Sequence, residues 1–449
     1  MEQTKKFKAI IVGGSVSGLT LALCFERANI DYIVLEAREK FAPQVGASVG
    51  LFPNGLRILD QLGITEKIEQ STEPLKKGYL RSSDGKIFCR TQIFDELFAR
   101  HGYKFVFLER QQLLSFLYEA ITNKSKLLAN KKVDKIEEDQ HGVKVKTTDG
   151  SVYEGDIVIG GDGVWSTVRE HMWNEMEKDE KLAAVLEEDR QALFSEYSCL
   201  FGISDKVQGI HEGRSNIIYG SGTSFLSAVG KGGTIYWFFF EKLPEVYKAP
   251  NIPRYSEQDA IDSAEKQADS LFTEDIKFAE IWKQRRSAVK VAMEEGVIKK
   301  WHYGRTVLLG DAAHKYTANF GMGANSCIES AVVFTNTLFE SLKEKPEGLD
   351  HSDIEKVFTT YQSKRQAHVE TVCTASSETT RTEALDGFKR AVMGKYIFPL
   401  LGDGVKLSMV KALMIPSPTL SFIDKPTRPH TIPYLDEEQP KGWFSWLGF

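Results

Sequence analysis

The residue pattern with the clearest chemical content starts at Gly310 and Asp311 and ends at Asn325. An apolar run at 306–309 predicts a strand that delivers the acidic side chain into a turn, and a helix-like run follows at 326–338. A glycine-containing loop joins the two. This order places a carboxylate, several free backbone N–H groups and a helix N-terminus at one point, which could hold a polyol chain and the phosphates of a dinucleotide.

A second glycine pattern lies near the N-terminus, at 13–18. Residues 7–12 predict a buried parallel strand, 19–28 a helix and 30–35 a second strand. The glycine-rich stretch would form the tight turn between the first strand and the helix. The whole is a βαβ unit, although an ordinary strand–turn–helix without a ligand has the same local pattern.

Each special position of this turn has an expected role in dinucleotide binding. Gly13, followed by Gly14, lets the chain turn sharply, and Gly18 lets helix and strand pack closely. Glu36, just after the second strand, can accept hydrogen bonds from a ribose diol. Ser15 replaces the middle glycine of the usual G-x-G-x-x-G, so its Cβ narrows the approach of a pyrophosphate, while its hydroxyl could contact phosphate instead.

Three signatures in this order resemble the single-component FAD-dependent monooxygenases of the para-hydroxybenzoate hydroxylase-like superfamily. They are the turn at 13–18, the Gly-Gly-Asp-Gly segment at 160–163 leading to Arg169, and the loop from Gly310 to Asn325. Within the superfamily the chain is most similar to the fungal epoxidases of indole-diterpene and meroterpenoid pathways, of the paxilline-pathway type. The stretches that support this closer resemblance are 46–55, 108–114, 235–238 and 425–430.

The resemblance implies that FAD is the cofactor and that residues far apart in the sequence bind it. Glu36 would bind the adenosine ribose, with Arg38 nearby, and Arg110 would reach the pyrophosphate or the ribityl chain. Asp311 would meet the ribityl or phosphate side. Gly50 would approach the flavin through its backbone.

The resemblance also implies that the N–H groups of Gly323, Ala324 and Asn325 lie near the isoalloxazine ring. Asp162 has two readings that the sequence leaves open. It is either a cofactor-binding residue or an ordinary β-turn carboxylate ahead of a helix that starts near Ser166.

In this superfamily NADPH or NADH reduces FAD, O₂ adds to give a flavin C4a-hydroperoxide, and the distal oxygen passes to the substrate. No natural side chain activates O₂, so the cofactor must do so. The resemblance points to epoxidation of a prenyl-chain alkene on a small molecule of secondary metabolism, with aromatic hydroxylation as the alternative. The predicted cavity is aromatic and aliphatic, with Trp237, Phe238 and Phe239 among the candidate lining residues.

Oxygen transfer would benefit from an acid near the substrate, because the leaving hydroxide needs a proton or a hydrogen bond. Tyr219 and Tyr236 lie on expected strands of the substrate domain, and family precedent favours Tyr219 as the catalytic acid. A tyrosine that only packs the core is the competing reading for either residue.

Two rival classes have a basis in the sequence. Residues 46–50 match the G-x-S-x-G of a hydrolase nucleophile elbow, yet prolines lie close on both sides, where that elbow needs a strand and a helix. The other rival is a non-enzymatic prenyl-binding protein on a flavin fold. Ser15 and Ala318 leave this second possibility open, because the family usually has glycine at the first position and proline at the second.

Composition excludes several partners. The chain has 449 residues, enough for two or three domains, and its net charge of −5 without a basic stripe argues against nucleic acid. The five cysteines are scattered without a C-x-x-C, and no histidine pair has metal-ligand spacing, so no metal site is expected. The first strand leaves no room for a signal peptide, which predicts a cytoplasmic protein. The oligomeric state stays open.

The expected fold class is α/β, with a Rossmann-like FAD-binding domain, a second domain built on an antiparallel sheet, and a helical C-terminal region. The cofactor segments lie at both ends and in the middle of the chain, so the FAD-binding domain must be assembled from separate pieces. The expected pieces are 1–75, 105–175 and 290–375 for FAD binding, 76–104 and 176–289 for the substrate, and 376–449 for the C-terminal region and tail.

The stretch 388–423 contains an amphipathic segment with two interpretations. It either packs on the protein's own body or makes a peripheral contact with a membrane surface. No uncharged apolar run approaches the roughly 20 residues needed to span a bilayer.

Overall fold

The strand expected near the N-terminus lies inside a six-stranded sheet in the computed structural model, which describes residues 7–44 and 48–437. Neighbouring strands are parallel except at one edge, where β17 pairs antiparallel with β18. Because β1, β11 and β18 are adjacent and parallel, the three motif turns that follow them emerge at one edge of the sheet. The strand order is β17 (His302–Tyr303), β18 (Thr306–Leu308), β11 (Ile157–Gly160), β1 (Lys8–Val12), β2 (Asp31–Leu35) and β7 (Leu127–Leu128).

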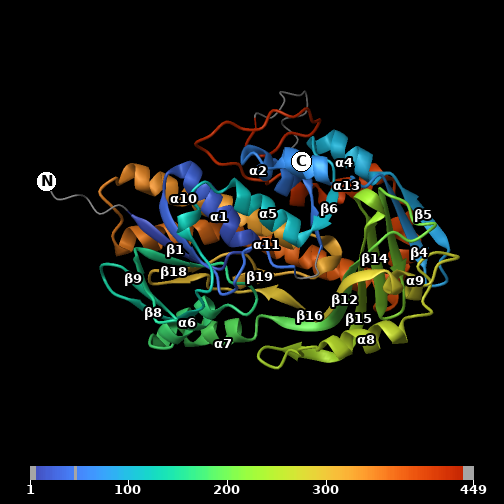
Figure 1. Ribbon diagram of the computed structural model, residues 1–449, viewed down its shortest axis with the longest axis horizontal. Helices are drawn as coiled ribbons and strands as arrows, with labels where there is room; N and C mark the ends of the chain where they lie inside the picture. Colours follow the sequence, from blue (N-terminus) through green and yellow to red (C-terminus); the bar gives the residue numbers. More distant parts are fainter. Residues whose placement is uncertain (1–6, 45–47, 438–449) are drawn as a thin grey trace.

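Different layers cover the two faces of this sheet (Figure 1). One face carries the helices α1 (Val16–Ala28), α5 (Arg110–Ala120) and α10 (Gly323–Glu344), which pack side by side. The other carries α6 (Thr167–Met176) and a small antiparallel sheet of β8 (Val133–Glu138), β9 (Val143–Thr147) and β10 (Val152–Gly155). Coverage on both faces explains why β1 and β11 are nearly continuous apolar runs.

A second sheet, of eight strands, dominates the other half of the molecule (Figure 1). All neighbouring pairs are antiparallel except β13 with β4, which run parallel. The expected separate piece at 76–104 supplies β4 and β5 to this sheet. The order is β19 (His314–Lys315), β16 (Arg285–Val297), β12 (Phe194–Ser204), β15 (Ile235–Lys248), β14 (Thr223–Val229), β13 (Arg214–Tyr219), β4 (Lys77–Ser82) and β5 (Ile87–Thr91).

Strand β15 divides its side chains between the two faces of this sheet. Trp237 and Phe239 pack against α8 (Glu257–Lys266) and α9 (Phe278–Lys283) on the outer face. Phe238 lies on the inner face. This alternation follows from the two-residue period of a strand.

Two long elements join the halves of the molecule. β16 continues through the expected boundary at 290, and α11 (His351–Glu383) continues through the one at 376. In the described part of the chain, no helix is both long enough and apolar enough to cross a bilayer. The remaining elements are β3 (Ser48–Leu51), paired with β6 (Val106–Glu109), and the helices α2 (Pro53–Gln61), α3 (Thr65–Ser71), α4 (Ile93–His101), α7 (Ala183–Arg190), α12 (Phe388–Val392) and α13 (Asp403–Met414).

Candidate cofactor and substrate site

The turn after β1 depends on its glycines. Gly13 has φ +100°, and a Cβ there would lie 2.5 Å from the carbonyl oxygen of Gly161. A Cβ on Gly18 would collide with the carbonyl oxygen of Gly13, and one on Gly14 would collide with the ring of Phe41. The missing side chains therefore let α1 begin close to β1 and bring the turn against the segment that follows β11.

The Glu36 carboxylate lies beside this turn, just after β2. It accepts hydrogen bonds from the backbone N–H of Gly14 at 2.6 Å and of Arg38 at 2.9 Å. The acidic side chain is thus held next to the glycine turn, where the ribose of a dinucleotide is expected.

Arg110, the first residue of α5, reaches the same place from another segment. Its Nη2 donates a hydrogen bond to Oγ of Ser15 at 2.6 Å. Burial lowers the pKa of Arg110 and the charge of Arg38 acts in the same direction, whereas Asp311 and Glu36 oppose both. These mutual effects mean that Glu36, Arg110 and Asp311 lie within electrostatic reach of one another.

Asp311 follows β18 at the same edge of the sheet. Its carboxylate pairs with the ammonium of Lys315 and accepts a hydrogen bond from Sγ of Cys327 at 3.6 Å. Burial favours a higher pKa for Asp311, but Lys315 outweighs it and the pKa falls below its usual range. Gly310 has φ +64°, and a Cβ there would collide with Ser17 of α1, so this loop touches the start of α1.

Asn325 joins the start of α10 to β3. Its amide nitrogen donates to the carbonyl oxygen of Gly50 at 3.0 Å, and its amide oxygen accepts from the N–H of Phe52 at 3.0 Å. No side chain caps α10, and the first N–H groups of a helix, here those of Gly323, Ala324 and Asn325, have no partner within it. Open space lies where a Cβ of Gly323 would be, so this helix end can receive a polar ligand group.

The side chain of Asp162 is used by the chain itself. It accepts hydrogen bonds from the hydroxyl of Ser166 and the N–H of Val168, both at the start of α6, and burial raises its pKa. Arg169 of the same helix donates to the carbonyl oxygen of Ala312 at 2.9 Å and so ties α6 to the Asp311 loop. The side chain of Asp162 thus makes the contacts expected of a turn carboxylate ahead of a helix, while its backbone lies against Gly13.

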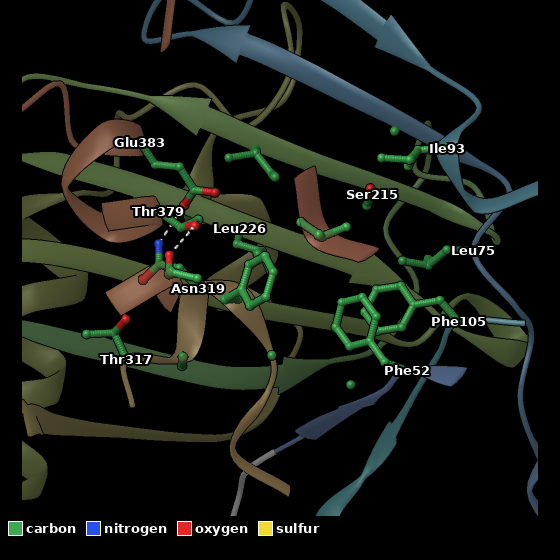
Figure 2. A pocket seen from close by; sticks show the side chains of 18 of the residues that line it. Phe52, Leu75, Ile93, Phe105, Ser215, Leu226, Thr317, Asn319, Thr379 and Glu383 are labelled. Carbon is green, nitrogen blue, oxygen red and sulfur yellow. Dashed lines mark hydrogen bonds between the residues drawn. The ribbon is translucent and has the colours of Figure 1, made fainter. Parts of the chain in front are cut away.

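A cavity of about 720 Å³ extends from these loops to the inner face of the eight-stranded sheet. Gly50, Gly323 and Ala324 line it, so it is continuous with the expected flavin loops. Figure 2 shows that its two ends differ, with Phe52 and Phe105 at one end and Asn319 and Glu383 at the other. The two rings stack with centroids 4.0 Å apart. Such a cavity suits a largely apolar molecule with one polar end.

Tyr219 lies in the wall of this cavity and is only 4% exposed. The edge of its ring contacts Phe88, with centroids 5.4 Å apart. Burial raises the pKa of Tyr219 far above its usual range, with Glu383 and Cys89 acting in the same direction. The phenol therefore stays protonated, which suits a hydrogen-bond donor, although the ring also packs the core.

Glu383 is a cavity residue that the sequence reasoning missed. It is the last residue of α11 and only 3% exposed. Burial raises the pKa of Glu383 to about 8, although a hydrogen bond from Asn319 acts against the rise. In the sequence it stands in a polar stretch, and only its spacing from the buried Ser376 and Thr380 could have indicated that it faces inward.

The expected aromatic lining is correct only in part. Phe238 lines the cavity, whereas Trp237 and Phe239 pack on the outer face under α8 and α9. Alternation along β15 makes it impossible for three consecutive side chains to share one face.

The hydrolase motif does not form a nucleophile elbow. Gly46 and Ala47 lie outside the described residues, but Ser48 opens β3, which pairs with β6, and α2 begins only at Pro53. The serine is therefore in a strand and not in the tight strand-to-helix turn that an elbow requires.

A family model described as "FAD binding domain" matches residues 6–376. The chain belongs to this FAD-binding family. The geometry fits the cofactor, because a glycine turn, two helix N-termini without side-chain caps and a half-buried arginine meet at one edge of the parallel sheet.

Curated relatives extend the family assignment to the activity. The chain is 38% identical to the FAD-dependent monooxygenase nvfK of Aspergillus novofumigatus, over 94% of this chain and 90% of that protein. It is 39% identical to the FAD-dependent monooxygenase penE of Penicillium thymicola, over 90% and 85%. The resemblance to fungal FAD-dependent monooxygenases is therefore confirmed, and the chain is an enzyme of this class with FAD as its cofactor. The relatives favour neither the hydrolase nor the non-enzymatic prenyl-binding protein.

A solved structure supports the fold assignment. Klebsiella pneumoniae HpxO, solved in complex with FAD and uric acid, matches with a TM-score of 0.75 and 20% identity. The match covers 91% of this chain and 96% of that one. The α/β fold class with a Rossmann-like FAD-binding domain is confirmed.

The C-terminal helices combine packing with exposure. Leu407, Leu413 and Met414 of α13 are buried against the body, as the first interpretation of this segment expects. Seven other apolar side chains of the region are exposed, and we call them the C-terminal apolar surface: Phe388, Met393, Tyr396, Ile397, Leu400, Val405 and Met409. Met393 and Met409 also line the cavity, so this surface borders its mouth.

Proposed function

We propose that this enzyme epoxidises an alkene in the prenyl chain of a meroterpenoid or indole-diterpene intermediate, with NADPH or NADH and O₂ as co-substrates. The reaction balances as alkene, O₂, NAD(P)H and a proton giving epoxide, NAD(P)⁺ and water. The observation that carries this proposal is the apolar cavity that is continuous with the cofactor loops. An alkene needs no charged partner, only a dry site that holds it near the oxygen donor.

Named residues would hold the cofactor. Glu36 would bind the adenosine ribose, Arg110 and Asp311 the pyrophosphate and ribityl region, and the N–H groups of Gly323 and Ala324 the ring. Bound FAD, once reduced, would activate O₂ so that one of its oxygen atoms can be transferred. The aromatic walls would exclude water and orient the chain, and Tyr219 would donate a hydrogen bond where negative charge develops on oxygen.

Aromatic hydroxylation is the second candidate, since a flat ring also fits an aromatic cavity. It normally uses a base that ionises a phenol. Among the described residues two carboxyl groups line the cavity: the Glu378 carboxylate is engaged by Arg390, and Glu383 has a pKa of about 8 and is mostly protonated at neutral pH. Neither is a free carboxylate at neutral pH, which is why hydroxylation is the second candidate.

The test is to supply the purified FAD-loaded enzyme with a farnesylated phenol, NADPH and ¹⁸O₂ and to locate the label by mass spectrometry. We expect one labelled oxygen in an epoxide of the side chain. A labelled oxygen on the ring would contradict epoxidation and support the hydroxylase. Heat-denatured enzyme and enzyme without NADPH serve as controls.

A further inference from the structure

The polar end of the cavity contains one carboxyl group without a charged partner. Glu383 ends α11, and its Oε2 accepts a hydrogen bond from Nδ2 of Asn319 at 2.5 Å (Figure 2). Within residues 7–44 and 48–437, no protein group forms a hydrogen bond with Oε1, and the residue lines the cavity. A side chain that is 97% buried therefore presents one oxygen to the space in which a substrate would bind.

The neighbouring polar groups fix which oxygen of this carboxyl accepts. The amide oxygen of Asn319 faces the Thr380 hydroxyl at 2.8 Å, as one of three acceptors within reach of its single proton, and the amide nitrogen faces Glu383. In a neutral carboxyl group the carbonyl oxygen is the better acceptor, so an amide N–H that donates to one oxygen favours the proton on the other. The proton of Glu383 therefore belongs on Oε1, on the cavity side.

The charged groups near Glu383 are engaged elsewhere. Arg381, two residues earlier, pairs with Glu295 and Glu196, and Lys406 of α13 pairs with Asp403. Among other titratable groups, Tyr219 of β13 and Cys89 of β5 lie on the facing strands, and Glu378 of α11 and Lys315 of β19 line the same cavity. Burial without a cation raises the pKa of Glu383 to about 8.

We propose that protonated Glu383 anchors the substrate by donating a hydrogen bond from Oε1 to a carbonyl oxygen at the polar end of the molecule. Asn319 holds the carboxyl group in the orientation required. The prenyl chain then extends along the cavity toward Phe52 and Phe105. This inference rests on the proposed function, because it assumes a prenylated substrate, and it adds that the substrate has a carbonyl group.

The anchor makes substrate affinity depend on pH. Ionised Glu383 has no proton to donate and repels a carbonyl oxygen. With a pKa of about 8 the protonated fraction falls about tenfold between pH 7 and pH 9, so the affinity for a carbonyl ligand should fall by about the same factor.

The first experiment detects the proton directly. Infrared difference spectra of the full-length FAD-loaded protein, wild type minus Glu383→Gln, should show the carbonyl band of a neutral carboxyl group at pH 6. The band should disappear with a midpoint near pH 8. Its absence at pH 6 would overturn the proposal. Unchanged melting temperature and flavin absorbance of the variant establish that it folds and binds FAD.

The second experiment measures binding through the perturbation of flavin absorbance. The probes are farnesylacetone and the hydrocarbon in which a methylene group replaces its carbonyl. We expect wild-type enzyme to prefer the ketone at pH 7 and to lose that preference above pH 8. Glu383→Gln should keep the preference without the pH dependence, because an amide still donates, whereas Glu383→Leu should lose it.

Glu378→Gln is the matched control, since this glutamate lies on the same helix and lines the same cavity but pairs with Arg390. It should leave the pH dependence intact. Equal binding of both probes by wild-type enzyme, or loss of the pH dependence in Glu378→Gln, would overturn the anchor. If wild-type enzyme prefers the ketone but the ¹⁸O₂ experiment puts the label on an aromatic ring, the anchor is supported and only the proposed epoxidation is rejected.

Discussion

Ser15 stands where dinucleotide-binding turns usually have a glycine, and the Arg110 guanidinium occupies the space beside it. The serine hydroxyl accepts a hydrogen bond from Arg110 at 2.6 Å. Arg110 also lies within electrostatic reach of Glu36 and Asp311. The departure from the usual pattern thus adds a hydroxyl that positions a cation where the phosphates of FAD are expected.

Replacing Arg110 by alanine should weaken FAD binding by about tenfold to a hundredfold, because a hydrogen bond to a charged group contributes about 1.5–3 kcal/mol. Titration of the apoprotein with FAD, followed by quenching of flavin fluorescence, measures the effect. Arg285→Ala is the control, since that exposed arginine stacks on Trp282 of α9. An unchanged Kd in Arg110→Ala would remove Arg110 from the cofactor site.

At the scale of elements, a buried ion pair joins α10 and α11 behind the cofactor loop. Arg365 donates to the Glu329 carboxylate at 3.0 Å, and Glu329 also accepts from Asn54 of α2 at 2.8 Å. The two charged side chains are 3% and 0% exposed. Burial favours a higher pKa for Glu329, but Arg365 outweighs it, and with His368 and Asn54 it lowers the pKa to about 2.

Arg365→Met should lower the free energy of unfolding by about 3–5 kcal/mol, because it leaves an uncompensated carboxylate in the core. Adding Glu329→Gln should restore part of the loss, which urea denaturation would measure. Lys67→Met, which breaks an exposed pair with Glu119, is the control and should cost less than about 1 kcal/mol. Equal losses of unfolding free energy in Arg365→Met and Lys67→Met would contradict a stabilising role for the buried pair.

The same pair predicts how stability responds to acid. Since folding lowers the pKa of Glu329, its stabilisation is complete above the usual pKa of 4.5 and is lost as the pH falls toward about 2. Glu329→Gln should therefore lose less melting temperature between pH 6 and pH 3 than wild type does. If the melting temperatures of the two proteins fall in parallel as the pH is lowered, the pKa of Glu329 is not lowered by folding.

The C-terminal apolar surface remains after α13 has packed on the body. Phe388 and Leu400 are 84% and 85% exposed, and the cations Lys389 and Lys395 lie between them in the sequence. Apolar and cationic side chains together are typical of contact with an anionic bilayer. We propose that this surface rests on a membrane and that apolar substrates enter the cavity there.

Phe388→Ser with Leu400→Ser should reduce binding to vesicles of phosphatidylcholine and phosphatidylserine by more than about tenfold, because burying each large side chain contributes about 1.5–3 kcal/mol. Co-sedimentation measures the bound fraction. Val246→Ser removes an exposed apolar side chain from β15 and should have no effect. If wild-type protein stays in the supernatant, the membrane contact is wrong.

At the scale of the whole molecule, the expected cofactor residues come from three remote segments that meet at one sheet edge. FAD bound there would link α1, α5 and α10, and the unfolded chain cannot present this site. FAD at a free concentration of 100 times Kd should therefore stabilise the protein by about 2.7 kcal/mol. Calorimetry of the apoprotein with and without FAD tests this. Riboflavin lacks the phosphates and adenosine. An equal shift in melting temperature with riboflavin at the same free concentration would therefore contradict the arrangement.

Local sequence patterns are enough to predict the turns at 13–18 and 310–325 and the parallel sheet that positions them. Glycine spacing and apolar runs express local backbone restraints, which the chain carries wherever it folds. The three-dimensional packing was needed to show that burial raises the pKa of Glu383 and that its side chain lines the cavity, that Trp237 faces away from it, and that β16 and α11 cross the expected boundaries. The burial of a side chain and the direction in which it points depend on atoms from distant segments. Neither can therefore be predicted from one stretch of residues alone.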